Sequence, residues 1–311
     1  MPYDLKLFSG TSNRPLAQEI TDYLNLPLGG LEVHNFSDGE IFVKYQENIR
    51  GADVFIVQST HSPPSNLIEL FLMIDAARKA SAKRVTAVVP YYGYSRQDRK
   101  DQPRVSISAK LMADLITRSG ADRVLTMDLH AAQIQGFFDI PVDHLYSSIT
   151  FTNYFKEMDI SDLVVVGPDV GSLRMARAYA KRLDAGLALI DKRRPHANSV
   201  EVMNVIGDVE GKNVLLRDDM VDTAGTLCEA ARALKEKGAA HIYAACTHGI
   251  LSGPAIERLK ESDIERLIVT NTIDIPERKR YTGLEIVSVG HIFGEAIRRT
   301  HDEESISSLF D

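Results

Sequence analysis

Residues 214–226 read VLLRDDMVDTAGT, and this stretch decides the fold. Its apolar first half is typical of a buried strand, which ends in the adjacent carboxylates Asp218 and Asp219. A short turn with Gly225 follows, and a helix is expected over Leu227–Lys237. Backbone N–H groups and Thr hydroxyls at the start of that helix can bind a phosphate, while the carboxylates can accept from vicinal sugar hydroxyls or hold Mg²⁺. A phosphorylated pentose satisfies both halves. The alternative is that the Asp pair only ends the strand and caps the helix.

The same alternation of strand and helix runs through the rest of the chain. The strand candidates are mostly continuous apolar runs, as in sheets covered on both faces: Val54–Gln58, Val85–Pro90, Arg123–Met127, Leu163–Val166, Leu187–Ile190, Val214–Leu216, Ile242–Ala245 and Leu267–Asn271. The helix candidates have one apolar face: Pro15–Leu24, Leu67–Lys79, Ser108–Arg118, Leu173–Arg182 and Leu227–Lys237. Gly120, Gly186 and Gly238 are expected to stop helices. The pattern predicts an α/β fold with mainly parallel sheets and functional groups at the carboxyl ends of strands.

Length and composition narrow the class of protein. A chain of 311 residues suits two domains, and we place them at residues 1–146 and 147–311. A net charge of −7 argues against a nucleic-acid partner, and no apolar run approaches a membrane span. Cys228 and Cys246 lack a metal-like spacing, so both are expected to be buried thiols in a reducing compartment. With no secretory signal in the sequence, we expect a cytoplasmic enzyme.

Two stretches carry a family resemblance. Residues 214–226 resemble the phosphoribosyl-diphosphate (PRPP) binding motif of type I phosphoribosyltransferases and PRPP synthetases. Residues 128–145, DLHAAQIQGFFDIPVDHL, are similar to the PRPP synthetase signature. The resemblance extends from Phe8 to Asp311. It implies two similar domains of the phosphoribosyltransferase type, each a mainly parallel sheet flanked by helices. It also implies that the last helix and tail, about 292–311, pack back on the N-terminal domain.

The resemblance implies a ribose-5-phosphate site in the second domain. Asp218 and Asp219 would face the ribose hydroxyls. The loop that follows would wrap the 5-phosphate with Asp222, Thr223, Ala224, Gly225 and Thr226. Arg217 and Ala224 depart from the family pattern, which usually has an apolar residue before the Asp pair and often a Gly in the loop. A cation at position 217 has to find a partner or reach solvent, because its burial is otherwise costly.

The first domain would bind ATP through three polar segments. Read without the resemblance, they are an ordinary turn, a solvated loop and a structural histidine. The resemblance makes Phe36 a stacking partner for adenine and gives nucleotide contacts to Asp38, Glu40, Arg96, Gln97 and Arg99. His130 and Asp169 would ligate the Mg²⁺ of Mg-ATP, although imidazole is an unusual ligand for this ion. The segment 35–40 would reach a neighbouring subunit, which implies an oligomer, hexameric in the family.

Two further segments bear on catalysis and regulation. The run DKRRP at 191–195 is either a solvated turn or a loop that closes over a reacting phosphate. The resemblance favours the second and makes Lys192 and Arg194 transition-state stabilisers. The tail would contribute Ser305, Ser307 and Phe310 to a regulatory anion site, with Arg50 and Arg104 as phosphate partners. Inorganic phosphate and ADP are the regulators that the resemblance suggests.

The activity implied is that of a ribose-phosphate diphosphokinase in nucleotide biosynthesis. Such an enzyme transfers the diphosphoryl group of Mg-ATP to the 1-hydroxyl of ribose 5-phosphate, giving PRPP and AMP. Phosphoryl-type transfer depends on positioning and charge stabilisation, which suits these residues. Two alternatives stay open: a salvage phosphoribosyltransferase that consumes PRPP, and a non-catalytic regulatory relative of the synthetase.

Overall fold

The structure is a computed structural model that describes residues 3–169, 171–193 and 202–310, with no side-chain detail at 192, 193, 202 and 203. The chain divides into two compact units. Unit 1 comprises Met1–Tyr146, Thr272–Asp274 and Ser288–Asp311, and unit 2 comprises Ser147–Asn271 and Ile275–Val287. The chain therefore passes from one unit to the other four times.

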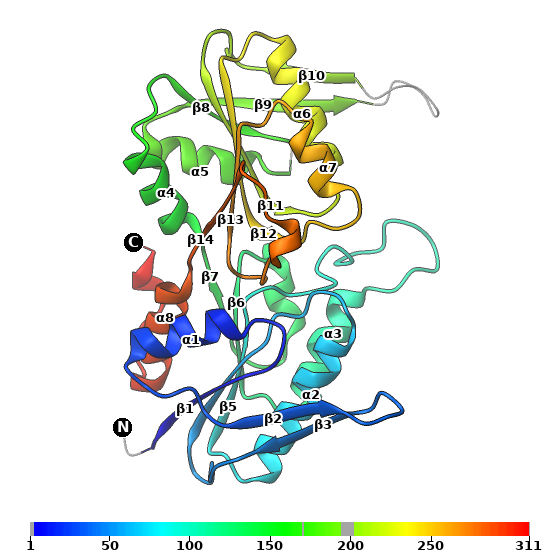
Figure 1. Cartoon of the computed structure of the whole chain (residues 1–311), viewed down its shortest axis with the longest axis vertical. Helices are drawn as coiled ribbons and strands as arrows, with labels where there is room; N and C mark the ends of the chain where they lie inside the picture. The colour runs from blue at the N-terminus through cyan, green and yellow to red at the C-terminus, as the bar shows by residue number, and fades with distance from the viewer. Residues whose placement is uncertain (1–2, 170, 194–201, 311) are drawn as a thin grey trace. The chain divides into compact units, whose positions relative to one another are not determined.

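Unit 1 is built on a five-stranded parallel sheet (Figure 1). Its strands, in spatial order, are β1 (Leu5–Ser9), β4 (Asp53–Val57), β5 (Arg84–Val89), β6 (Arg123–Met127) and β7 (Val142–Leu145). Side chains alternate between its faces, so one face packs on α2 (Ser65–Lys79) and α3 (Ser108–Ser119) and the other on α1 (Arg14–Leu24) and α8 (Gly290–Asp302). A separate antiparallel hairpin consists of β2 (Leu31–Asn35) and β3 (Ile41–Tyr45). Short 3₁₀ turns are η1 (Ala132–Phe137) and η3 (Ser307–Leu309).

Unit 2 is built on a seven-stranded sheet. Its spatial order is β10 (Val202–Ile206), β9 (Gly186–Arg193), β8 (Leu163–Gly167), β11 (Asn213–Val221), β12 (His241–Gly249), β13 (Arg266–Thr270) and β14 (Leu284–Val287). All neighbours are parallel except β9 and β10, which form an antiparallel pair. One face packs on α4 (Ser148–Glu157) and α5 (Leu173–Leu183), the other on α6 (Gly225–Glu236) and α7 (Ala255–Lys260). The 3₁₀ turn η2 (Glu277–Lys279) follows β13.

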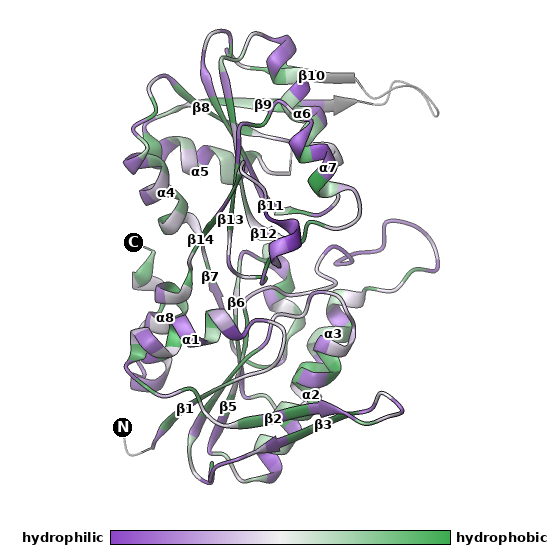
Figure 2. Cartoon of the chain, in the orientation of Figure 1, coloured by the Kyte–Doolittle hydropathy of each residue, from purple (hydrophilic) through white to green (hydrophobic). Residues whose placement is uncertain are grey.

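Both sheets are covered on both faces, which explains their near-continuous apolar strands (Figure 2). The predicted α/β class, with two similar and mainly parallel units, is confirmed. Within each unit the carboxyl ends of parallel strands share one edge of the sheet, so the loops that follow them gather there. None of the described helices is long and apolar enough to cross a lipid bilayer.

Helix ends follow local chemistry, with one correction to the prediction. The Asn13 side chain caps α1 by accepting from Leu16 N–H at 3.3 Å. Gly120, at φ 108°, ends α3 in the left-handed region, as predicted. Gly186 does not stop α5, because Asp184 at φ 50° already does. Gly186 instead opens β9, where an added Cβ would lie 3.1 Å from a Val164 methyl group.

Candidate active site

The carboxylates Asp218 and Asp219 lie near the carboxyl end of β11, in the interior of the unit 2 sheet, and both are half-buried. The Asp219 N–H donates to Asp218 Oδ1 at 2.9 Å. Burial raises the pKa of the Asp218 carboxyl to about 8, and the charges of Asp219 and Asp169 add to the shift. A cation bound near Asp218 would relieve this unfavourable accumulation of negative charge.

The loop Asp222–Thr226 passes directly into α6, whose first residue is Gly225. Ala224 adopts φ 61°, a left-handed conformation that explains why glycine suits this position. The N–H groups of a helix start are unsatisfied within the helix, so the loop offers donors and a positive dipole end to an anion. The structure thus joins the predicted phosphate loop to the predicted sugar clamp at one strand end.

Residues outside the motif fix the course of this loop. Ser252 Oγ donates to the Asp222 carboxylate, and the Ser252 N–H donates to Asp222 O at 2.9 Å. Arg258 Nη1 of α7 donates to Thr223 O at 3.0 Å. Sequence reasoning missed these residues, although Ser252 follows β12, the neighbour of β11, and the strand-end rule points there.

Arg217 is fully buried directly before the Asp pair. Its guanidinium carbon lies 4.7 Å from the Phe151 ring centre and 4.8 Å from that of Tyr179. It donates to Thr247 Oγ1 (2.7 Å), Ser147 Oγ (3.1 Å) and Ala245 O (3.2 Å). Because neighbours in a strand point to opposite faces, the cation lies on the α4 and α5 face and the Asp218 side chain on the other. These contacts explain how β11 accommodates a charge where the family has an apolar residue.

Asp169 follows β8, which pairs with β11, so it stands at the same sheet edge as Asp218. Its Oδ1 accepts the Ser172 N–H at 2.8 Å, and the residue is exposed. The described residues contain no ready-made cluster of three or more metal-binding side chains. Mg²⁺ commonly binds through one or two carboxylates plus substrate phosphates, and the mutual repulsion of Asp169 and Asp218 is what such a cation relieves. The donor set therefore fits an ion that arrives with a substrate.

Of the two predicted catalytic cations, only Lys192 lies within the residues that the structure describes. Lys192 lies in β9, where its backbone pairs with Met203 of β10. The segment predicted to be a loop or hairpin is thus a hairpin at its base. Arg194 lies outside the described residues.

In unit 1, the predicted nucleotide residues follow β5 and β6, which are parallel neighbours. Arg96 and Arg99 are exposed on the loop after β5, and His130 is exposed after β6. Gln133 Nε2 donates to Asp98 at 3.1 Å and so joins the two loops. The side-chain oxygen of Gln97 accepts a hydrogen bond from the Ser108 hydroxyl at the start of α3. This bond ties the loop after β5 to α3.

The remaining nucleotide residues lie at the tip of the hairpin β2–β3, which projects beyond α2 in the view of Figure 1. Asp38 Oδ1 accepts the Glu40 N–H at 3.0 Å and closes the turn. The Phe36 ring meets only His34 (5.6 Å) and Phe42 (5.8 Å) among the described aromatic pairs, and 51% of Phe36 is exposed. The structure does not bring this tip to the loops after β5 and β6.

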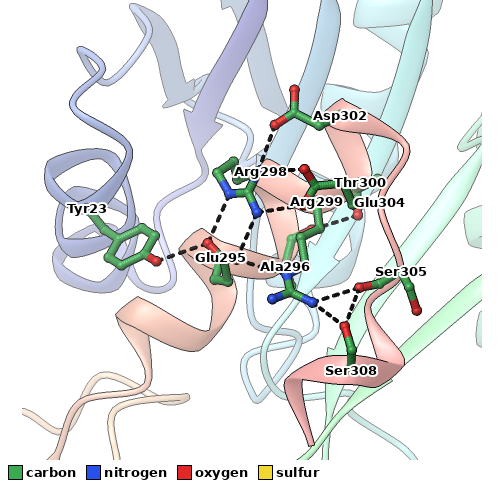
Figure 3. A network of polar contacts seen from close by, with 10 residues as sticks. All are labelled: Tyr23, Glu295, Ala296, Arg298, Arg299, Thr300, Asp302, Glu304, Ser305 and Ser308. Carbon is green, nitrogen blue, oxygen red and sulfur yellow. Dashed lines mark hydrogen bonds and ion pairs between the residues drawn. The ribbon is translucent and has the colours of Figure 1, made fainter.

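The C-terminal tail is fastened to unit 1, and Figure 3 shows the polar network at its start. Arg299 donates to Ser305 O (2.8 Å) and Ser308 Oγ (2.5 Å). Phe310 packs edge-on against Tyr146 at 5.3 Å, and Ser305 Oγ lies 2.9 Å from Ser307 Oγ. Within the described residues, neither Arg50 nor Arg104 forms a hydrogen bond or ion pair with the tail, whereas Arg299, which the sequence reasoning missed, does.

Comparison with known proteins identifies the family. Residues 5–120 match the family described as the N-terminal domain of ribose phosphate pyrophosphokinase, and residues 194–311 match the phosphoribosyl synthetase-associated domain. A ribose-phosphate pyrophosphokinase from Chlorobaculum tepidum is 58% identical over 312 residues, covering 100% of this chain and 96% of the relative. One from Clostridium perfringens is 57% identical, covering 99% and 98%. The crystal structure of phosphoribosylpyrophosphate synthetase from Mycobacterium smegmatis has a TM-score of 0.91 and 42% identity, covering 96% of this chain and 99% of that one. The chain belongs to the ribose-phosphate pyrophosphokinase family of transferases.

Proposed function

We propose that this enzyme transfers the diphosphoryl group of ATP to the 1-hydroxyl of ribose 5-phosphate. The 1-hydroxyl oxygen attacks the β-phosphorus, the bond from that phosphorus to the α–β bridging oxygen breaks, and AMP leaves with the electron pair. The hydroxyl proton passes to a base or solvent, and PRPP is the second product. The observation that carries the proposal is the end of β11, where a half-buried Asp pair is followed within four residues by a phosphate loop opening α6.

Unit 2 would hold the acceptor sugar. Asp218 and Asp219 accept from the ribose hydroxyls, and the N–H groups of Asp222–Thr226 with the two Thr hydroxyls bind the 5-phosphate. Binding the 5-phosphate and the ribose hydroxyls fixes the position of the reacting 1-hydroxyl, which lowers the entropy cost of the reaction. Asp219 is the candidate general base.

Unit 1 would hold the nucleotide. Arg96 and Arg99 are exposed cations on one loop, as polyphosphate binding requires, and His130 follows the neighbouring strand. Gln97 supports that loop through Ser108. Phe36, Asp38 and Glu40 at the exposed hairpin tip are proposed to complete the adenine site of a neighbouring copy, so the active form is an oligomer, hexameric as in the resemblance.

Mg²⁺ is the proposed cofactor, with His130 and Asp169 as its protein ligands. When bound, it neutralises phosphate charge and polarises the phosphorus under attack. Lys192 and Arg194 are proposed to stabilise the negative charge that grows on the transferring group. Inorganic phosphate and ADP are proposed regulators acting at the tail, with Ser305, Ser307 and Phe310 as contacts. We expect the enzyme to act in the cytoplasm, where ATP and sugar phosphates are available.

A product assay tests the function. Purified protein, ATP, ribose 5-phosphate and Mg²⁺ are incubated with and without inorganic phosphate, and AMP, ADP and PRPP are separated by chromatography. Equal amounts of AMP and PRPP support diphosphoryl transfer. ADP in place of AMP would indicate γ-phosphoryl transfer, and no turnover in either condition would favour the salvage transferase or the regulatory relative.

A further inference from the structure

Two cations outside the binding motif stand beside the phosphate loop of unit 2. They are Arg258, from α7, and Lys279, from η2. The loop Asp222–Thr226 itself contains one charged residue, the carboxylate Asp222. A sugar phosphate carries close to two negative charges at neutral pH, so a loop with a net negative charge is a poor receptor without help from its surroundings.

The Arg258 side chain reaches from α7 to the first residues of α6. Its Nη1 donates to Thr223 O at 3.0 Å, and a Cβ added to Gly225 would lie 3.3 Å from the same nitrogen. Holding the Thr223 carbonyl with a charged donor fixes the orientation of the peptide group between Thr223 and Ala224, because its C=O and N–H point in opposite directions. The N–H of that peptide belongs to the phosphate loop.

Lys279 approaches the other end of the same loop. Its Nζ donates to Ile250 O at 3.0 Å, and the Ile250 N–H donates to Val221 O at 3.0 Å, one residue before the loop. Lys279 is half-buried; burial lowers its pKa, the charge of Arg278 lowers it further, and the charge of Asp222 raises it. The ammonium group and the Asp222 carboxylate thus act on each other electrostatically. Together, the two cations turn the local charge from negative to positive.

We propose that Arg258 and Lys279 are positioning residues for the 5-phosphate of ribose 5-phosphate. They act through the loop: Arg258 orients the peptide after Thr223, and Lys279 offsets the charge of Asp222. The inference rests on the proposed function, because it assumes that this loop receives the sugar phosphate. It extends the site to two residues that lie 32 and 53 positions after Thr226, at 258 and 279.

The test compares substrate affinities in three charge-neutralising variants. R258Q and K279Q remove the proposed cations, and K260Q removes an exposed charge from the same helix α7 as a matched control. We expect the KM for ribose 5-phosphate to rise about tenfold in R258Q and in K279Q, the loss typical of a hydrogen bond to a charged group. The KM for ATP, kcat and the melting temperature should stay close to those of the wild type, as should all parameters of K260Q. R258K should recover most of the affinity.

Added salt gives a second readout. It should raise the KM for ribose 5-phosphate more in the wild type than in the R258Q/K279Q double variant, because the variant has lost the screened attraction. An unchanged KM for ribose 5-phosphate in both single variants would overturn the proposal. A parallel loss of ATP affinity and melting temperature would also overturn it, by showing a purely structural role. If the wild type makes no AMP, the proposed function fails, and calorimetric titration of ribose 5-phosphate into wild type and R258Q still decides the inference.

Discussion

The buried Arg217 gives a quantitative prediction about stability. Removing only its partner Thr247, as Thr247→Val, leaves a charged N–H without the acceptor that lies 2.7 Å away, at a cost of about 2 kcal/mol. In Arg217→Leu the guanidinium is absent, and the same Thr247→Val change should cost only about 1 kcal/mol, because it then breaks only the neutral hydrogen bond to Ser147 Oγ. Arg217→Leu alone should be within about 1.5 kcal/mol of the wild type. Its lost hydrogen bonds and ring contacts are offset by the relief of burying a charge, and Ser147 and Thr247 still bond each other at 2.9 Å.

The double-mutant cycle is measured by urea unfolding followed by far-UV circular dichroism, because the chain has no tryptophan to report by fluorescence. Thr126→Val is the control: Thr126 is also fully buried in a strand, but its hydroxyl has no hydrogen-bond partner among the described residues and it lies in unit 1. It should be neutral or stabilising in both backgrounds. Equal costs of Thr247→Val in the two backgrounds would refute the view that Arg217 is held by specific hydrogen bonds.

Three further predictions concern the candidate site residues. Lys192→Ala should lower kcat by about 100-fold or more while ATP binding is kept, and unchanged turnover would remove Lys192 from catalysis. Because the pKa of Asp218 is raised above its unfolded value, the wild type loses stability as the pH rises from about 4 to about 8. Asp218→Asn should therefore raise the melting temperature of the ligand-free protein at pH 8 by a few degrees and have little effect at pH 5, and equal effects at both pH values would contradict this origin of the shift. Phe36→Ala should raise the KM for ATP about tenfold without changing the melting temperature, since the exposed ring has few contacts to lose; a matched Phe42→Ala variant shows the effect of damaging the hairpin itself.

Much of the fold could be predicted because the central strands are apolar on both faces. β4, β5, β8 and β13 are of this kind, and so is the first half of β11. The prediction missed β1 and β7, the two outermost strands of the unit 1 sheet. It also missed β2, β3 and β14, whose residues are at best half-buried and therefore carry a weaker apolar signal. It did not include β10 as a strand, although β10 reads VMNVI, because this part of the chain is predicted to be a loop or hairpin.

The site motif could be predicted because its residues are consecutive and belong to one strand, one loop and one helix start. The residues that hold the loop in place could not be predicted. Arg258 and Lys279 reach Thr223 and Ile250 only through the packing of α7 and η2, which no local pattern encodes. The same holds for Arg217, whose cation lies between Phe151 and Tyr179, residues 66 and 38 positions earlier in the chain. The sequence shows that a cation at position 217 needs a partner, and the three-dimensional structure shows which residues provide it.

The position of α8 has a consequence for synthesis on the ribosome. The apolar sheet face of unit 1 that begins with Leu7 is completed by Ile292, Phe293 and Ile297, which follow the whole of unit 2 in the chain and are translated after it. Unit 2 ends at Val287 and can emerge in full before that cover exists. Unit 1 begins before unit 2 but is completed only after it, and it exposes a hydrophobic surface in the interval. A premature stop or proteolytic nick just before α8 would uncover this face and leave every residue of the loop Asp222–Thr226 in the product.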